Sequence, residues 1–331
     1  MSRQIWNKSR VLITGGLGFI GSNLAMTLVK MGADATIVDS LDKNCGGNIN
    51  NIRPIQNKIN LKIYDLNDRR KLASDIKDND IIFNLAGQTS HTKSMSDPLS
   101  DLRNNLQAHI ELLEACRTHN LHAKVIYTGT RSEYGKSEYL PVDERHPTNP
   151  TDVNGINKLA AEKYHLLYGF AHGMNVCCLR IANTYGERHQ MKTGDGFVNW
   201  FARQAIDGKP ISIFGNGDSL RDVIYVGDVV ECLIKAAEDK KSNGQIYNVG
   251  SGMPIKIRQI AEQIVKEIGY GKINFVKYPR AFKKIEIGDF YCSLRKIKKE
   301  ISWKPKTSFS DGIANTIRFY RENKSDYWSN D

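Results

Sequence analysis

A glycine-rich segment near the N-terminus has residue types and spacing that suit phosphate binding. An apolar run, residues 11–13, leads into residues 14–21, which read Thr-Gly-Gly-Leu-Gly-Phe-Ile-Gly and open a helical pattern. Such glycines allow a tight turn, bring the backbone close to a pyrophosphate and let a helix pack against a strand. The N–H groups at the start of the helix then face the phosphates. The segment predicts a dinucleotide site, with Gly15, Gly18 and Gly21 at the pyrophosphate.

A carboxylate follows at the spacing expected for a nucleotide ribose. Asp39 ends the second apolar run and lies 18 residues after Gly21. In dinucleotide-binding folds an acid near this position accepts hydrogen bonds from the adenosine ribose. The next three residues, 40–42, include no arginine that would hold a 2′-phosphate. The pattern therefore predicts NAD rather than NADP as the cofactor.

The hydrophobic pattern predicts the elements that position these residues. Strand-like and helix-like segments alternate, which predicts an α/β, Rossmann-type, doubly wound parallel sheet with helices on both faces. The predicted strands are 10–14, 34–39, 60–64, 80–85, 123–128 and 175–181, and the two longest predicted helices are 98–119 and 152–172. Ligands bind at the carboxyl ends of such strands. We therefore expect Asp65 at the adenine and residues 84–87 at the ribose.

The 331 residues, of which 40% are hydrophobic, can form one large or two closely packed domains. The second half is more often interrupted by glycine and proline than the first. We expect residues 1–178 to form the NAD-binding domain, with 222–248 returning to it. Residues 179–221 and 249–331 are expected to form a smaller C-terminal substrate-binding domain.

Composition limits the classes of partner. The formal net charge is +11, but the late lysines alternate with apolar residues without an arginine–aromatic pattern, so we expect no nucleic-acid partner. No apolar run approaches the ~20 residues that span a bilayer, and residues 1–9 are polar, so we expect a cytoplasmic protein without a membrane partner. The six cysteines form no Cys-x-x-Cys pair, which predicts free thiols and no metal site.

Several motifs occur in one order along nearly the whole chain. They are residues 14–21, Asp39, 130–135, Lys158, 179–186, 215–222 and 225–228. Together they resemble the extended short-chain dehydrogenases/reductases, specifically the NAD-dependent nucleotide-sugar epimerase/dehydratase family. The resemblance implies a tightly held NAD, a nucleotide diphosphate sugar as substrate, and transient oxidation of the sugar, usually at C4.

The resemblance also implies roles for single residues. Thr130 matches the residue that hydrogen-bonds the reacting hydroxyl, and Lys158 matches the lysine that binds the nicotinamide ribose. Asn183 and Arg221 match residues at the substrate phosphates. The cofactor contacts implied are Gly15, Gly18, Phe19, Ile20, Gly21, Asp39, Asp65, Leu66, Leu85, Ala86, Gly87 and Lys158. Family members often pair helices like those at 98–119 and 152–172, so we expect a homodimer or a higher homo-oligomer.

The chain departs from the family at its catalytic base. The family motif is Tyr-x-x-x-Lys, in which both side chains share one helical face and the lysine stabilises a tyrosinate. Here Asn154 stands four residues before Lys158. Its amide can orient a hydroxyl or a water but takes no proton. Another group is then the base, or the reaction needs less basic help, or the site does not turn over; an engineered replacement is a further interpretation.

Two side chains are candidates to replace the tyrosine. Lys158 beside a cationic nicotinamide would have a lowered pKa and act through water. His91 follows the fourth strand and is expected to face the sugar, where an imidazole titrates in a useful range. The alternative for His91 is a hydrogen bond that only orients the substrate.

A second departure concerns dehydration. Dehydratases of the family place Asp-Glu directly after the threonine, whereas Arg131 and Ser132 follow Thr130 here and Glu133 is displaced. We therefore predict oxidation at C4 by an epimerase or a 4-dehydrogenase, rather than dehydration or decarboxylation. The alternatives are an epimerase of a keto sugar without net NAD cycling, and a catalytically silent protein that binds NAD and a nucleotide sugar.

Overall fold

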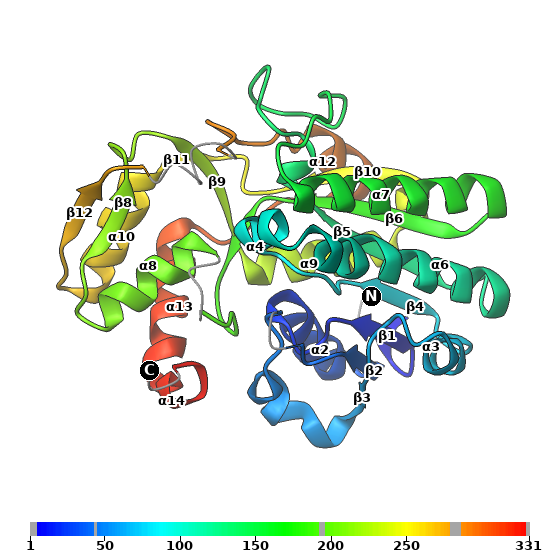
Figure 1. Cartoon of the computed structure of the whole chain (residues 1–331). Coiled ribbons are helices and arrows are strands. Elements are labelled where there is room, and N and C mark those ends of the chain that lie inside the picture. The colour runs from blue at the N-terminus through cyan, green and yellow to red at the C-terminus, as the bar shows by residue number, and fades with distance from the viewer. Residues whose placement is uncertain (1–4, 43–44, 192–195, 279–285, 329–331) are drawn as a thin grey trace.

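A seven-stranded sheet forms the centre of the molecule (Figure 1). The computed structural model describes residues 5–42, 45–191, 196–278 and 286–328. All neighbouring strands of this sheet pair in parallel. In spatial order the strands are β10 (Gln245–Val249), β6 (Asn175–Ile181), β5 (Lys124–Thr130), β4 (Ile81–Asn84), β1 (Arg10–Thr14), β2 (Asp34–Asp39) and β3 (Ile59–Ile63).

Helices cover both faces of the sheet. One face carries α2 (Phe19–Met31), α9 (Val226–Glu238) and α12 (Arg295–Ile301), and the other carries α3 (Arg69–Ile76), α6 (Ala108–His119) and α7 (Val153–His172). Strand residues alternate between the two, because successive side chains of a strand point to opposite faces. Leu12 packs in a different cluster from Val11 and Ile13. An apolar core therefore lies between the sheet and the helices on each face, and the predicted α/β class is confirmed.

The strand order reverses beside β1. The chain runs from β1 to β2 and β3 on one side, and β4, β5 and β6 lie on the other. Thr14 of β1 lies opposite Asn84 of β4, at the carboxyl ends of both strands. Ligands of open α/β sheets bind at such a reversal, because the connections leave in opposite directions and open a crevice.

A smaller layer lies beside the large sheet. It contains a three-stranded sheet of β11 (Pro254–Lys256), β9 (Leu220–Tyr225) and β7 (Asn183–Tyr185), and a pair of β12 (Ile273–Val276) and β8 (Ile211–Phe214). Its helices are α8 (Phe197–Ile206), α10 (Ile257–Ile268) and α13 (Phe309–Glu322). The division into two domains stays a proposal; β10 and α9, from the segment expected to return, belong to the large sheet and its covering helices.

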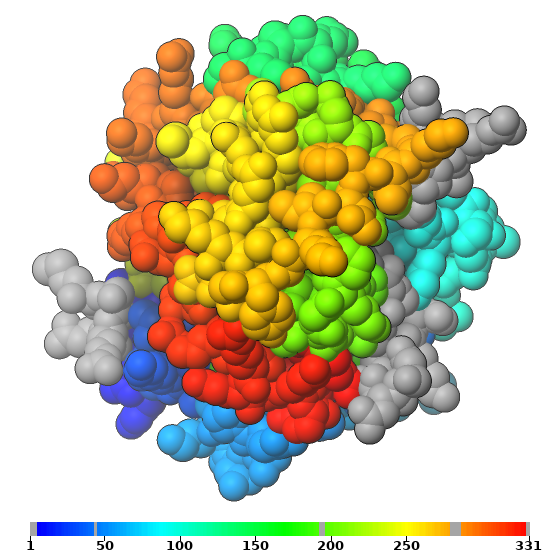
Figure 2. Space-filling view, turned by 90° about the vertical axis from the view of Figure 1, so that its left-hand side faces the viewer, coloured from blue at the N-terminus to red at the C-terminus, as the bar shows by residue number. Residues whose placement is uncertain are grey.

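The C-terminal end of the described chain contacts the first half of the chain. Helix α14 (Lys324–Tyr327) lies beside η1 (Ile49–Lys58), as Figure 2 shows on the side of β12 and α10. Arg53 pairs with Asp326 at 2.9 Å, and the Tyr327 hydroxyl donates to Asn51 Oδ1 at 2.6 Å. These bonds hold the small layer against the edge of the large sheet.

The predicted element bounds agree closely with the structure. The strands predicted at 10–14, 34–39 and 175–181 have these bounds, and the others differ by at most two residues at either end. The helix predicted over 98–119 is divided into α5 (Pro98–Leu102), the π-helical η2 (Arg103–Gln107) and α6. In the described part of the chain, no helix combines the length and the apolar character needed to span a bilayer.

Candidate active site

The glycine turn between β1 and α2 leaves no room for side chains. Gly15 has a φ of 66°, in the left-handed region, and a Cβ there would lie 2.9 Å from Ala86 Cα. A Cβ on Gly21 would lie 2.3 Å from the carbonyl oxygen of Gly15. Gly18 precedes α2 without a side-chain cap. The first N–H groups of α2 are therefore not capped by the turn and can bind an anion.

The acidic residues predicted for the cofactor lie at the ends of β2 and β3. Asp39 accepts hydrogen bonds from the N–H groups of Leu17, at 3.0 Å, and Leu41, at 2.9 Å. Burial raises the pKa of Asp39, and these two bonds act against that rise. Asp65 accepts from Arg103 at 3.0 Å. Both carboxylates are thus held in place at the carboxyl edge of the sheet.

The remaining predicted cofactor contacts occupy the same edge. Phe19 and Ile20 open α2, and Leu66 is buried after β3. Leu85, Ala86 and Gly87 follow β4. The structure therefore brings the predicted cofactor residues to one edge of the sheet.

A buried polar network, which the sequence did not reveal, ties the turn to the helices behind it. Thr14 Oγ1 donates to Asn84 Oδ1 at 3.0 Å and accepts from the N–H groups of residues 85 and 86. The Asn84 amide also bonds to His109 at 2.9 Å and His165 at 3.1 Å. Burial lowers the pKa of His165 to about 4 and that of His109 well below its usual value, so both rings are neutral. The network fixes β1 and β4 against α6 and α7.

Lys158 lies beside the cofactor edge. Its ammonium donates to the Thr128 carbonyl at 3.4 Å, and a Cβ on Gly87 would lie 2.9 Å from its Nζ. Burial lowers the pKa of Lys158 to about 8, although the charges of Glu133 and Asp101 act in the opposite direction. Lys158 therefore connects the cofactor segment to the end of β5, where Thr130 begins the short turn η3 (Arg131–Glu133).

Asn154 is buried within a network of amides around one carboxylate. Its Nδ2 donates to the Gln88 carbonyl at 2.9 Å and to Asp101 Oδ2 at 3.4 Å. Asp101 also accepts from Asn105 at 2.9 Å and Asn157 at 2.8 Å. All four side chains are buried. Asn154 therefore joins α7 to α5 and η2. At the sequence position of the family's tyrosine, its side chain is engaged in a structural network.

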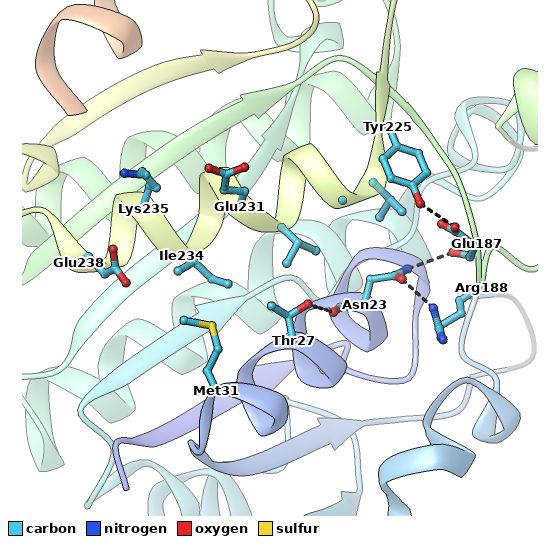
Figure 3. Close-up of a pocket in the computed structure, with 13 residues that line it drawn as sticks. Asn23, Thr27, Met31, Glu187, Arg188, Tyr225, Glu231, Ile234, Lys235 and Glu238 are labelled. Atoms are coloured by element: carbon cyan, nitrogen blue, oxygen red, sulfur yellow. Dashed lines mark hydrogen bonds between the residues drawn. The ribbon is translucent and has the colours of Figure 1, made fainter. Parts of the chain in front are cut away.

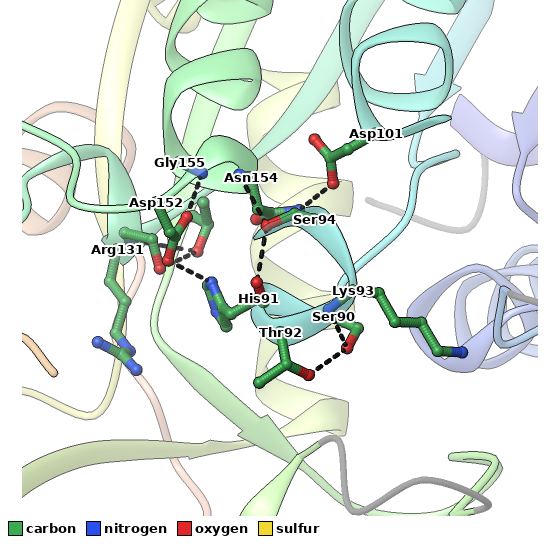
Figure 4. Close-up of polar contacts among 12 residues, drawn as sticks. Ser90, His91, Thr92, Lys93, Ser94, Asp101, Arg131, Asp152, Asn154 and Gly155 are labelled. Atoms are coloured by element: carbon green, nitrogen blue, oxygen red, sulfur yellow. Dashed lines mark hydrogen bonds and ion pairs between the residues drawn. The ribbon is translucent and has the colours of Figure 1, made fainter. Parts of the chain in front are cut away.

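His91 and Asp152 form a pair next to this network (Figure 4). His91 Nδ1 lies 2.8 Å from Asp152 Oδ2, and the other oxygen of Asp152 accepts from Gly155 N at 2.7 Å to cap α7. Burial acts to raise the pKa of Asp152, but the hydrogen bonds from His91 and Gly155 N, together with the charge of Arg131, act against it, and the pKa lies below its usual value. Ser94 Oγ donates to the His91 carbonyl at 2.8 Å and accepts from Asn154 N at 3.3 Å.

A positively charged cluster lies beyond Thr130. Arg221 donates to Glu286 at 2.6 Å and is almost fully buried. Arg131 Nε donates to Asn183 Oδ1 at 3.2 Å, while its Nη1 is buried with no hydrogen-bond partner among the described residues. Burial lowers the pKa of Arg131 to about 10, and the charge of Arg221 acts in the same direction. The cluster therefore contains one buried guanidinium donor without a partner among the described residues, which suits an anionic ligand.

Glu133 lies inside the protein. It shares Arg180 with Glu162: the Arg180 guanidinium donates to Glu133 at 3.1 Å and to Glu162 at 2.7 Å. Burial and the charge of Glu162 raise the pKa of Glu133, while the charge of Arg180 and the N–H of Thr130 act against that rise. Tyr134 is also buried and donates to Asn248 Oδ1 at 2.7 Å.

A separate cavity of about 420 Å³ lies between α2 and α9 (Figure 3). None of the predicted site residues lines it. Two of its acids are already engaged, because Glu187 accepts from the Tyr225 hydroxyl at 2.6 Å and Glu238 accepts from Trp6 Nε1 at 2.7 Å. Over the ranges that the structure describes, no three His, Cys, Asp or Glu side chains are grouped to hold a metal ion.

Comparison with known proteins agrees with this arrangement. The NAD dependent epimerase/dehydratase family model matches residues 11–250. A UDP-glucose 4-epimerase of Mycolicibacterium smegmatis is 31% identical over 325 residues, which cover 96% of this chain and 99% of that protein. A dTDP-glucose 4,6-dehydratase of Streptomyces niveus is 28% identical, with 96% and 94% covered. The solved UDP-glucose 4-epimerase of Thermus thermophilus with NAD has a TM-score of 0.85 at 28% identity, with 94% and 99% covered.

Proposed function

We propose, from the fact that the chain belongs to the NAD-dependent epimerase/dehydratase family, that it oxidises a nucleotide diphosphate sugar at C4. The outcome is either epimerisation, when the hydrogen returns to the other face, or net 4-dehydrogenation. NAD is the cofactor, as the family description states. NAD supplies a two-electron acceptor for the hydrogen at C4, and the chain's own residues bind the sugar and move the proton.

One observation carries this proposal: a line of contacts too close for a Cβ connects the glycine turn to Lys158. A Cβ on Gly15 would meet Ala86 at 2.9 Å, and a Cβ on Gly87 would meet Lys158 Nζ at 2.9 Å. A dinucleotide whose pyrophosphate lies at the first contact therefore extends its other end toward the second. These residues fit NAD, because phosphate donors, a ribose acid and a buried lysine lie along one edge of the sheet.

The positive cluster supports an anionic substrate. Arg131, Asn183 and Arg221 lie together after Thr130, and Arg131 keeps a buried donor without a partner. Leaving such a donor unpaired costs about 1–3 kcal/mol, which a bound oxyanion would recover. The diphosphate of a nucleotide sugar has this chemistry. We propose that these three residues bind it while Thr130 hydrogen-bonds the reacting hydroxyl.

The position of Glu133 favours epimerisation or dehydrogenation over dehydration. Its carboxyl group is held by Arg180 and by the backbone N–H of Thr130. An acid that is fully buried and held by these donors is not available to a bound sugar. Arg131 and Ser132, which follow Thr130, supply no carboxylate in its place.

The expected homodimer stays a prediction. Leu99 of α5 and Phe170 of α7 are 77% and 91% exposed, and large exposed apolar side chains mark interaction surfaces. Cys116, from the same predicted helix as Leu99, packs inside the subunit core. The helices expected to pair therefore carry apolar groups suited to contact with a second copy.

A substrate screen tests the proposed function. Protein saturated with NAD is incubated with UDP-, dTDP-, GDP- and CDP-glucose and with UDP-N-acetylglucosamine, and products are followed by chromatography and mass spectrometry. We expect an isomer of unchanged mass or a product lighter by two hydrogens. No change in any sugar, with NAD still bound, would contradict the proposal and favour the catalytically silent alternative.

Single-turnover absorbance then separates the enzymatic alternatives. Oxidation at C4 produces a transient NADH signal. Isomer formation from a keto sugar without that signal would favour epimerisation without net NAD cycling.

A further inference from the structure

The fold places His91 at the cofactor edge of the sheet. Strand β4 ends at Asn84, the connection continues through Gly87, and α4 (His91–Ser96) begins at His91. Ser90 caps α4 by accepting from Lys93 N. The ring therefore stands at the start of a helix that follows the strand next to the glycine turn, where it is 36% exposed.

Two contacts tie His91 to the start of α7. Asp152 Oδ2 bonds its ring at 2.8 Å, and Ser94 joins its carbonyl to Asn154 N through bonds of 2.8 Å and 3.3 Å. The ring is therefore held beside the position where the family has its tyrosine (Figure 4).

Asp152 sets the hydrogen on the ring. Its carboxylate is buried and its pKa lies below the usual range, despite the opposing effect of burial. An ionised carboxylate only accepts, so the neutral form of His91 carries its hydrogen on Nδ1 and has its lone pair on Nε2. Among the described residues, the ring of His91 is hydrogen-bonded at Nδ1, and its side chain is 36% exposed. The pair therefore leaves one imidazole nitrogen free to accept a proton.

The other two candidates are less suited to this task. The Asn154 amide donates to Gln88 and Asp101 and has no proton to exchange. Lys158, whose pKa burial lowers to about 8, is mostly charged at neutral pH, and its ammonium donates to the Thr128 carbonyl. A charged ammonium accepts no proton.

We propose that His91 is the catalytic acid–base residue that replaces the family's tyrosine, and that Asp152 is the residue that positions it. This inference rests on the proposed function. As the substrate C4–H bond transfers its hydride to NAD, the O–H bond breaks, its electron pair completes the C=O bond, and the proton forms an N–H bond at His91 Nε2. In the reverse step the hydride returns to C4 and Nε2 gives the proton back to the oxygen.

The tautomer of His91 tests the pair without turnover. ¹⁵N-histidine NMR of the NAD-saturated protein reports which ring nitrogen carries the hydrogen, and His91→Gln assigns the signal among the eight histidines. We expect hydrogen at Nδ1 in the wild type and at Nε2 in Asp152→Asn. The asparagine keeps its oxygen on Gly155 N and turns its NH₂ toward His91. Hydrogen at Nε2 in the wild type would overturn the proposal.

Steady-state kinetics test the catalytic role. The substrate is UDP-glucose or dTDP-glucose, depending on which of the two the wild type converts. We expect His91→Gln and Asp152→Asn each to lower kcat by roughly 10²–10⁴-fold, with KM changed by about twofold or less. The double variant should be no slower than His91→Gln, because Asp152 acts through His91. Asp68→Asn, which changes the acid that caps α3, is the matched control and should leave kcat unchanged.

The two failures are distinguishable. A wild type that turns over while His91→Gln is equally fast overturns this inference alone. If the loss of kcat in the double variant equals the product of the losses in the two single variants, the positioning role of Asp152 is overturned. A wild type that converts no sugar defeats the proposed function, and with it the catalytic role of His91.

Discussion

The two sides of the candidate active site are built in different ways. The cofactor side, around the glycine turn, is made of backbone, and we call it the backbone wall. Its close contacts are between Gly21, Gly15 and Ala86. The opposite side, which we call the side-chain wall, is made of side-chain pairs whose partners lie far apart in sequence. His91 and Asp152 are separated by 61 residues, and Asn154 and Asp101 by 53. A site made of backbone can be recognised from local spacing, whereas a site made of distant pairs needs the fold.

The largest effect is expected on the side-chain wall, from Asn154→Asp. The new carboxylate would lie where Nδ2 now donates to the Gln88 carbonyl at 2.9 Å and approaches Asp101 at 3.4 Å. An unpaired buried charge beside another acid costs about 3–5 kcal/mol. We expect the free energy of unfolding at pH 8, measured by urea denaturation, to fall by this amount.

The pH dependence of the same variant fixes the cause. Burial and Asp101 raise the pKa of the new acid in the folded state above about 4, its value in the unfolded chain. Its folded form therefore binds more protons, so the variant approaches wild-type stability near pH 4 and loses stability as the pH rises. The exposed Asn60→Asp is the control. A penalty independent of pH would show that charge is not the cause.

The backbone wall is tested by Gly21→Ala, for which we expect the second-largest effect. A Cβ at 2.3 Å from the Gly15 carbonyl oxygen must push the helix away from the turn. Such overpacking costs about 1–3 kcal/mol, and displaced N–H groups bind the pyrophosphate poorly. We expect NAD affinity, measured by calorimetry, to fall by roughly 10²-fold.

A matched glycine gives the control for the backbone wall. Gly46 has nothing within 4 Å of a Cβ, so Gly46→Ala should keep wild-type affinity for NAD. Equal losses in both variants would mean that the turn is not tight. Asn154→Asp, examined below its destabilising pH, should bind NAD normally if the two walls are separate.

The contrast explains how much the sequence predicts. The α/β class, the sheet strands of the first half and the positions of the glycine turn and Asp39 follow from periodicity and spacing, and the structure agrees. Cys177 and Cys178, which are adjacent in β6, pack in different clusters, as the alternation of side chains along a strand requires. These features depend on neighbours within a few residues or on strict alternation.

The parts not predicted depend on long-range pairing. Asp152 can be recognised from sequence as a helix cap, since it directly precedes the helical pattern. Its pairing with His91 cannot, because that contact requires α4 and α7 to pack. The buried guanidinium of Arg131 and the amides around Asp101 have the same origin. Glu133 likewise looks like a displaced site residue in sequence, and only packing shows that it belongs to the core.

Lys158 lies between the two walls and has an intermediate expected effect. Burial lowers its pKa from 10.5 to about 8 in the folded protein. Between these values the unfolded chain binds more protons, so this group makes the wild type more stable as the pH rises from 8 toward 10. Lys158→Met removes that slope, on the order of 2 kcal/mol over the window.

Thermal unfolding at several pH values measures this difference. Lys124, whose pKa burial also lowers to about 8, provides the comparison, because Lys124→Met removes a similar slope far from the site. Only Lys158→Met should also abolish sugar turnover and weaken NAD binding. Unchanged turnover in that variant would show that the roles implied by the family do not carry over at this position.

The smallest effect is expected from Ser94→Ala, which separates rigidity from chemistry on the side-chain wall. The Ser94 hydroxyl accepts from Asn154 N and donates to the His91 carbonyl, so its loss leaves a buried N–H unpaired at about 1–2 kcal/mol. NAD affinity should not change, since no backbone contact of the turn is involved. Turnover should fall by less than in His91→Gln, because Asp152 still holds the ring. NAD affinity is measured by calorimetry, with the exposed Ser96→Ala as the control. A loss of NAD affinity in Ser94→Ala alone would mean that the two walls act as one rigid unit, and that the difference between backbone and side-chain contacts does not separate their functions.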